Sequence, residues 1–114
     1  MTSVRRALGD HGETLVANWY EDHGYTVVAR NWRCRNGEID IVAAKGSVVV
    51  ICEVKTRSSN RFGLPVEAIT FTKQRRLRRL AAMFLAANPQ RANEIRFDVG
   101  SVQGNSVELL EGVV

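Results

Sequence analysis

Residues 37–55 decide the fold, and they read GEIDIVAAKGSVVVICEVK. Apolar residues dominate the stretch on both sides of a polar turn at Gly46, and this pattern is typical of two strands joined by a hairpin. The run 48–52 is apolar without alternation, as expected for a strand that is covered on both faces. The stretch therefore predicts two central strands, Glu38 to Ala44 and Ser47 to Lys55.

Helices are predicted before and after these strands. Apolar residues at helical spacing, closed by Gly24, predict a first helix from Ala7 to His23, and a second stripe followed by Pro89 predicts a helix from Thr72 to Ala87. The other predicted elements are strands at Tyr25 to Asn31, Ile95 to Val102 and Ser106 to Leu110, and an exposed loop at Thr56 to Leu64. The expected fold is α/β, with a central mixed sheet flanked by helices, in one domain over residues 1–114.

The charge balance favours a polyanionic partner. Sixteen Lys and Arg residues against twelve Asp and Glu residues give a net charge of +4. Five of the cations fall within seven residues of the second predicted helix: Lys73, Arg75, Arg76, Arg78 and Arg79. Part of this cluster is a solvated face, but its density is easiest to explain if phosphates lie opposite it. Thr56, Arg57 and Arg61 would extend the basic surface.

Several other classes of protein are disfavoured. Cys34 and Cys52 resemble neither a disulfide framework nor a zinc site, and His11 and His23 have no second ligand pair nearby. No stretch is long and apolar enough for a signal peptide or a membrane span, so a cytoplasmic location without a membrane partner is expected.

Three residues in the central strands carry the chemical signal. Side chains alternate along a strand, so Glu53 and Lys55 share one face, and pairing through the turn at Gly46 brings Asp40 near Glu53. Charges at the ends of apolar strands are costly without a partner, and Mg²⁺ is a natural partner for carboxylates and waters. Lys55 would then orient a water or stabilise charge on a phosphate. The alternative is a salt bridge between Lys55 and one carboxylate, which leaves the second acid uncompensated.

Glu13 is a third carboxylate candidate, on the flank of the first predicted helix. The neighbouring Gly12 makes the helix slim where Glu13 would approach the sheet, although a solvated surface glutamate is an equal alternative.

The ordered motifs resemble the YraN family of bacterial proteins in the PD-(D/E)XK nuclease superfamily. The likeness runs from Gly9 to about Val102 and is carried by these matches: Gly12-Glu13, Ala17, Tyr20, Gly24-Tyr25, Arg30-Asn31-Trp32, Gly37-Glu38-Ile39-Asp40, Glu53-Val54-Lys55-Thr56-Arg57, Gly63, Pro65, Glu67-Ala68, Lys73 and Arg96-Phe97-Asp98-Val99. Members of the family look like archaeal Holliday junction resolvases, so the resemblance implies a restriction-endonuclease-like αβββαβ core.

The resemblance also implies roles for particular residues. Glu13, Asp40 and Glu53 would hold Mg²⁺ or Mn²⁺ together with the backbone carbonyl of Val54, and Lys55 would take the catalytic lysine's place. The implied reaction is hydrolysis of DNA phosphodiester bonds, with branched DNA as a candidate substrate. Thr56, Arg57, Arg61, Lys73 and Arg76 are the predicted nucleic-acid contacts, and a homodimer is expected by analogy alone.

Two other functions stay open at this stage. The chain could be a nucleic-acid-binding module that cuts poorly or not at all, or a scaffold whose basic helix docks an acidic protein. Among other residues, Asn31 is expected either to contact nucleic acid or to close the first strand. Asp98 is expected to pair with a cation, Trp19 to belong to the core, and Trp32 is a candidate for base stacking.

Overall fold

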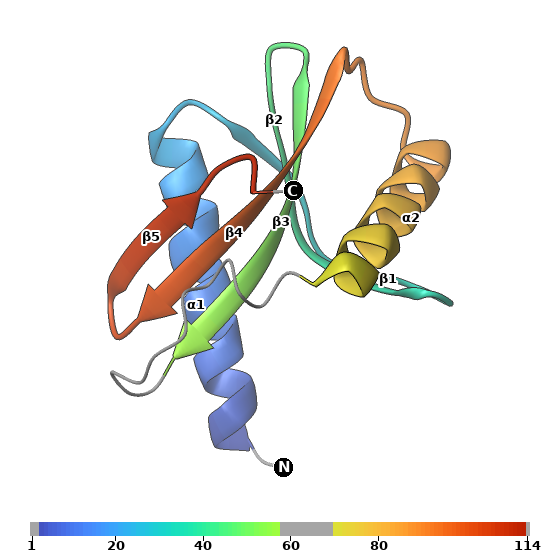
Figure 1. Ribbon diagram of the computed structural model, residues 1–114. Helices are drawn as coiled ribbons and strands as arrows, with labels where there is room; N and C mark the ends of the chain where they lie inside the picture. Colours follow the sequence, from blue (N-terminus) through green and yellow to red (C-terminus); the bar gives the residue numbers. More distant parts are fainter. Residues whose placement is uncertain (1–2, 58–69, 114) are drawn as a thin grey trace.

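The computed structural model describes residues 3–57 and 70–113, with side chains described from Asp10 onward. Over these ranges a helix, three strands, a second helix and two more strands follow one another (Figure 1). Their bounds are α1 Ser3–Asp22, β1 Thr26–Cys34, β2 Gly37–Lys45, β3 Val48–Arg57, α2 Phe71–Ala87, β4 Glu94–Gln103 and β5 Ser106–Leu110.

The five strands form one mixed sheet in the order β1-β2-β3-β4-β5. β3 and β4 pair in parallel and are connected through α2, whereas the other neighbours are antiparallel. The apolar run of β3 thus lies at the centre of the sheet, as its continuous hydrophobicity predicted. The predicted α/β class with a restriction-endonuclease-like core is confirmed.

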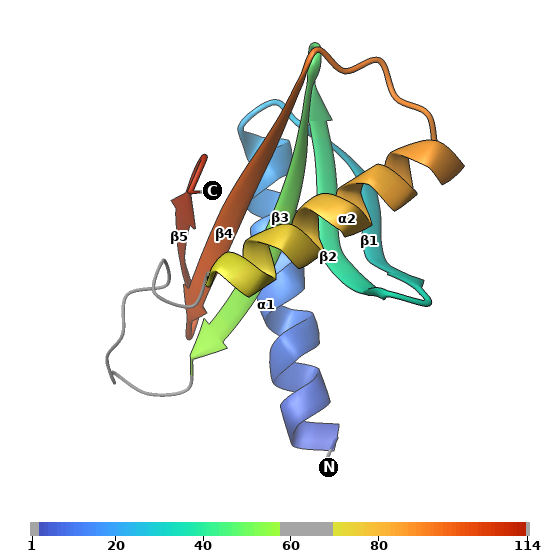
Figure 2. The ribbon, with the colours of Figure 1, turned by 45° about the vertical axis from the view of Figure 1, so that its right-hand side comes forward.

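Each face of the sheet is covered by one helix, and Figure 2 shows α2 in front of the sheet and α1 behind it. Val16 and Tyr20 of α1 pack with one set of strand residues, and Leu80 and Phe84 of α2 pack with the other. All four side chains are buried. The alternation along β3 supplies both cores, because neighbouring residues of a strand point to opposite faces. None of the described helices is long and apolar enough to cross a membrane.

Two predicted strand ends were wrong. β1 does not close at Asn31 but continues to Cys34, because Trp32 still pairs with Ile39 across the hairpin. β3 continues through Thr56 and Arg57, which were predicted to begin a loop. Parallel pairing with β4 gives the backbone of these polar residues its partners, so they need no apolar character to stay in the strand. The rest of the predicted loop, residues 58–64, lies outside the described residues.

A buried polar cluster joins α1 to the C-terminal end of the described chain. Asp98 on β4 is 2% exposed and accepts hydrogen bonds from the Tyr20 hydroxyl (2.7 Å), from Nε and Nη2 of Arg96 (both 2.9 Å) and from the Gly112 amide (3.0 Å). The predicted pairing of Asp98 with a cation is confirmed. Burial raises the pKa of Tyr20, so this hydroxyl stays protonated and remains a donor.

Candidate metal-binding and catalytic site

The β1–β2 hairpin changes face at the candidate site. Arg30 lies on the α1 side, where its Nη2 donates to Thr14 (3.0 Å), but Trp32 packs edge-on against Phe84 of α2 on the other side. Residues two apart in a regular strand share a face, so the alternation is broken between them. Asn31 carries the break, with a left-handed φ of 52° inside the strand. Asparagine tolerates this conformation better than most residues.

The same break appears on the partner strand. Ile39 belongs to the core under α2, whereas Ile41 belongs to the core under α1. Asp40 therefore lies at the point where β2 passes from one face to the other. Regular pairing of β2 with β3 ends at Ile41 and Cys52, and beyond it the Asp40 carboxylate accepts a hydrogen bond from the Val54 amide at 2.8 Å.

Asp40 is electrostatically coupled to the acids around it. Burial is the main cause that raises the pKa of its carboxyl group, and the carboxylates of Glu38 and Glu53 raise it further. The hydrogen bond from the Val54 amide and the charge of Lys55 act in the opposite direction. The predicted proximity of Asp40 to Glu53 and Lys55 is thus present, with more negative than positive charge around Asp40.

Glu53 and Lys55 share one side of the sheet, with Val54 on the other, as their parity predicted. The shared side is the one that α2 covers, whereas Val54 packs on the α1 side. The Lys55 ammonium lies 3.9 Å from Oε1 of Glu53. Oε2 of Glu53 is buried and has no hydrogen-bond partner. The simple salt bridge is therefore present, but it leaves a buried carboxylate oxygen unsatisfied, which costs free energy unless a ligand compensates it.

Glu13 approaches the sheet from α1 and is not a solvated surface residue. Its exposed fraction is 9%, and its Oε1 is buried without a hydrogen-bond partner, 3.9 Å from Nη2 of Arg30. Burial raises the pKa of Glu13, and the charge of Asp40 raises it further. Gly12 makes this approach possible, since a Cβ at that position would collide with Oγ1 of Thr56.

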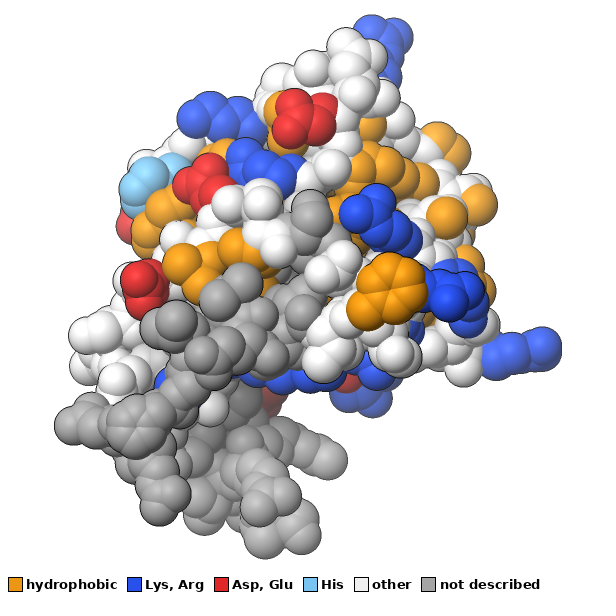
Figure 3. All heavy atoms as spheres, viewed as in Figure 1, with side chains coloured by type: hydrophobic (Ala, Val, Ile, Leu, Met, Phe, Trp, Pro, Cys, Tyr) orange, Lys and Arg blue, Asp and Glu red, His pale blue; other side chains and the backbone are white. Residues whose placement is uncertain are grey.

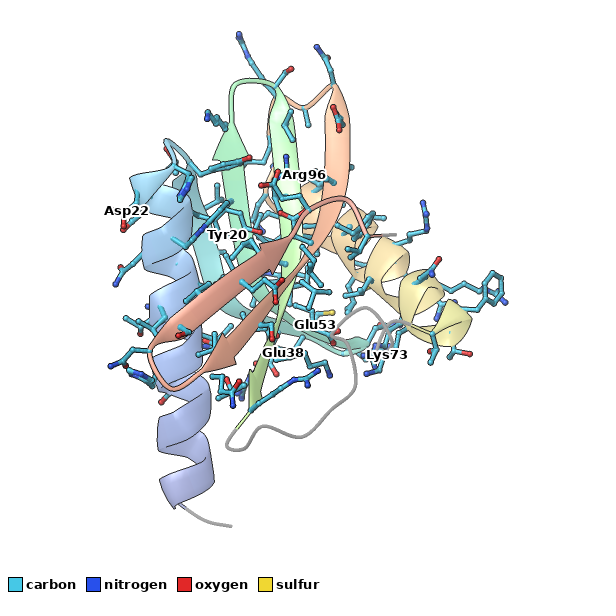
Figure 4. All side chains as sticks on the ribbon, turned by 60° about the vertical axis from the view of Figure 1, so that its left-hand side comes forward. Tyr20, Asp22, Glu38, Glu53, Lys73 and Arg96 are labelled. Carbon is cyan, nitrogen blue, oxygen red and sulfur yellow. The ribbon has the colours of Figure 1, made fainter. Side chains whose placement is uncertain are left out.

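Two of the predicted acids, Glu13 and Glu53, interact electrostatically with Asp40. Glu13 reaches it from the α1 side and Glu53 from the α2 side. On the α2 side a pocket of about 240 Å³ is lined by Glu38, Asp40, Glu53 and Arg76, among others. Figure 4 shows Glu38, Glu53 and Lys73 at one end of the sheet, away from Tyr20 and Arg96. The pocket has room for several waters or a phosphate group beside the carboxylates.

Carboxylate oxygens are the type of donor that a hard divalent ion prefers, with waters or substrate oxygens completing its coordination. Among the described residues, no group of three or more His, Cys, Asp or Glu side chains is arranged so that it could hold a metal ion. Mg²⁺ does not require such a group, because it is usually bound by one or two carboxylates, waters and phosphate oxygens. The unsatisfied oxygens of Glu13 and Glu53 are suitable donors.

The predicted nucleic-acid contacts divide between the two faces. Lys73 lies beside Lys55, whose ammonium lowers the pKa of Lys73, and Arg76 lines the pocket. Thr56 is on the other side, with its hydroxyl against Gly12. Arg57 shares strand parity with Lys55, and Arg61 lies outside the described residues.

Sequence reasoning missed two contributors to the site. Glu38 was read only as part of a motif, yet it lines the pocket and raises the pKa of Asp40. Asn31 does not close the first strand, because β1 continues through it to Cys34, and the sequence did not show that it is the position at which β1 changes face. The sequence signal for the second was an asparagine in an otherwise β-favouring run, which is compatible with a positive φ.

The sheet order, the two covering helices and the acidic site on β2 and β3 define an α/β protein with a restriction-endonuclease-like core. The sequence model of the Uncharacterised protein family UPF0102 matches residues 12–102, which span α1 to β4. The chain belongs to this family, which is the YraN family that its motifs indicated.

Curated relatives from several bacteria are similar over most of their length. A UPF0102 protein of Nocardia farcinica is 51% identical over 98 residues, which cover 86% of this chain and 77% of the relative. A UPF0102 protein of Beutenbergia cavernae is 52% identical over 99 residues, which cover 87% of this chain and 84% of the relative. A UPF0102 protein of Moorella thermoacetica is 46% identical over 113 residues, which cover 99% of this chain and 94% of the relative.

Proposed function

We propose that this protein is a metal-dependent endonuclease that hydrolyses DNA phosphodiester bonds. The observation that carries the proposal is that one buried carboxylate oxygen of Glu13 and one of Glu53, two acids that interact electrostatically with Asp40, have no hydrogen-bond partner. A structure gains nothing in stability from such groups, so a ligand that compensates them is the simplest reason for their presence. A cytoplasmic site of action is part of the proposal.

The proposed ligands are Glu13, Asp40, Glu53 and the carbonyl of Val54, with Mg²⁺ or Mn²⁺ as the ion. The chemistry that such an ion supplies is Lewis acidity toward a phosphodiester oxygen and toward the attacking water. Lys55 is held 3.9 Å from Glu53 and close to Asp40, where its ammonium can orient the water or stabilise negative charge on the phosphate. Arg76 at the pocket and Lys73 beside Lys55 would bind the flanking phosphates.

Cleavage assays test the proposal directly. Linear, nicked and branched DNA would be incubated with Mg²⁺ or Mn²⁺ and the parent protein, Asp40→Asn or Lys55→Met. Cutting by the parent, with losses of at least roughly hundredfold in both variants, is expected from the removal of one electrostatic contribution at a reacting centre. Glu94→Gln is a matched control, because Glu94 is exposed at the far end of β4. Equal cutting by all four proteins would indicate a contaminant and refute the assignment.

A second candidate is a nucleic-acid-binding module with the same fold. Two observations favour it. The Asp40 carboxylate already accepts a hydrogen bond from the Val54 amide. Among the described residues, no three Asp, Glu, His or Cys side chains form a group that could hold a metal ion. Such a module would bind DNA with an affinity that falls steeply with salt, and it would cut none of the substrates. A homodimer, if formed, would present two such surfaces to two strands.

A further inference from the structure

The cations of α2 lie on two different sides of the helix. At about 100° per residue, Lys73 and Arg76 fall roughly 140–200° around the helix from Phe71, and they face the candidate site. Arg75 and Arg78 fall within about 60° of each other, with Phe71 between them, on the side toward β4. The proposed nuclease activity accounts for the first pair of cations and leaves the second pair unexplained.

A groove runs between α2 and β4 on this second side. The guanidinium of Arg78 lies 5.5 Å from the ring centroid of Phe97 on β4. A mostly apolar pocket of about 250 Å³ opens here, and we call its lining residues the α2–β4 groove: Arg78, Ala81, Ala82, Ile95 and Phe97. Pockets for small molecules usually measure roughly 300–1,000 Å³, so this smaller, open pocket suits one bulky side chain of a larger partner.

Exposed apolar surface extends the groove along the helix. Among the described residues, the two large apolar side chains that are exposed are Phe71, at 72%, and Ile95, at 41%. The guanidinium of Arg75 lies over the Phe71 ring, 5.8 Å from its centroid. The row from Phe71 to Ala82 extends about 16 Å along the helix axis, which is the length of roughly five residues of extended chain. An apolar pocket that continues into such a row is typical of an interaction surface.

The charge of this surface selects the kind of partner. α2 contains five cations and no Asp or Glu. Across the described parts of the chain, no carboxylate forms an ion pair with Arg75 or Arg78. Figure 3 shows Lys and Arg side chains beside hydrophobic ones over the right-hand part of the molecule, where Figure 1 places α2. A partner with carboxylates around an apolar side chain is complementary to this arrangement.

We infer that the α2–β4 groove docks a segment of a partner protein that carries acidic residues around a bulky apolar anchor. A second copy of this chain fits less well, because a two-fold interface would place Arg75 and Arg78 near their own counterparts. Nucleic acid fits less well too, because its phosphates would meet the arginines but leave the apolar pocket unfilled. The inference is independent of the proposed nuclease activity.

The test begins with selection of peptides against the full chain from a random library displayed on phage. Enriched peptides should combine Asp or Glu with a bulky apolar residue, and their affinity should fall as salt rises. Arg78→Glu and Ile95→Thr should each weaken a labelled, selected peptide roughly tenfold or more. Exposed Arg75→Glu replaces the first variant if that one fails to fold. Arg35→Glu makes the same charge change at the opposite edge of the sheet and should bind as the parent does.

Nuclear magnetic resonance then locates the peptide on the protein. Addition of the peptide should shift the backbone amide signals of Ala82, Ile95 and Phe97 more than those of Glu38 and Asp40 at the acidic pocket. Ile95→Thr should cut DNA as well as the parent if the parent cuts it. Peptide binding at the groove in a parent that cuts no DNA would refute the nuclease and leave the docking surface standing.

Several results would overturn the docking surface. Failure of the selection, or enriched peptides without acidic residues, would remove the proposed partner chemistry. Undiminished peptide binding by Arg78→Glu and Ile95→Thr would place the peptide elsewhere. A dimer of the parent that Ile95→Thr abolishes, measured by sedimentation, would assign the groove to a second copy. Amide shifts at the groove on addition of duplex DNA, or of vesicles of anionic phospholipid, with none from selected peptides would assign it to those partners.

Discussion

Binding of a divalent ion at the site should raise the thermal stability of the protein in a predictable way. For 114 residues the entropy of unfolding is about 0.24 kcal/mol per degree. An ion that binds the native state alone stabilises it by about 1.4 kcal/mol for each tenfold increase in concentration above its dissociation constant. The melting temperature of the parent should therefore rise by roughly 6 °C per tenfold increase in Mn²⁺ once the site is saturated.

Asp40→Asn should be at least as stable as the parent when a chelator removes metal ions, and less stable than the parent in Mn²⁺. Burial raises the pKa of Asp40 in the folded protein, so ionisation of this group costs stability as pH rises from its ordinary value through the raised one. Asparagine removes that cost and can still accept from the Val54 amide. At pH 7 with a chelator the variant should melt at or above the parent. In Mn²⁺ it should melt below the parent, because it has lost a charged ligand.

Differential scanning fluorimetry or calorimetry across a Mn²⁺ series measures both effects, and Glu94→Gln serves as the control that should follow the parent. The reasoning is refuted if the parent gains no stability from Mn²⁺, or if Asp40→Asn gains as much as the parent does.

The remaining predictions concern the supports of the site and the basic helix. Tyr20→Phe should destabilise the protein by about 1.5–3 kcal/mol and lower its melting temperature by roughly 6–12 °C, because it removes a hydrogen bond to the buried carboxylate of Asp98. A decrease in melting temperature of less than about 2 °C would contradict this. Gly12→Ala should destabilise the fold by about 1–3 kcal/mol through collision with Thr56, and chemical denaturation should show that Thr56→Ala in the same chain recovers most of the loss; additive losses would show that the close approach is unimportant. Arg76→Gln should weaken DNA binding and reduce the slope of log affinity against log salt by about one; an unchanged slope would remove Arg76 from the phosphate contacts.

The fold was readable from the sequence because local patterns and the global arrangement agree. The apolar run of β3 predicted a central strand, and the stripes that contain Leu80 and Val16 predicted a helix on each face. The parity of Glu53 and Lys55 was also readable, because alternation along a regular strand needs no tertiary information. Predictions succeeded wherever a strict period was maintained.

The sequence did not predict features that depend on a break in the side-chain alternation of a strand or on contacts between distant parts of the chain. A regular strand would have kept Arg30 and Trp32 on one face, and only the positive φ of Asn31 reverses the hairpin beside Asp40. Tyr20 belongs to the core through its bond to Asp98, a contact between residues 78 positions apart. The buried state of Glu13 likewise depends on the close packing of Gly12 against Thr56, which spacing alone could not establish.

The most direct measurement is the anomalous difference density of a crystal soaked in Mn²⁺. The proposed function predicts one or more peaks within coordination distance of the Asp40 carboxylate, with Glu53 or Glu13 as a further protein ligand and waters completing the shell. A well-diffracting soaked crystal with no peak there, or with Mn²⁺ only at exposed surface carboxylates, would contradict the metal site and the hydrolytic function with it.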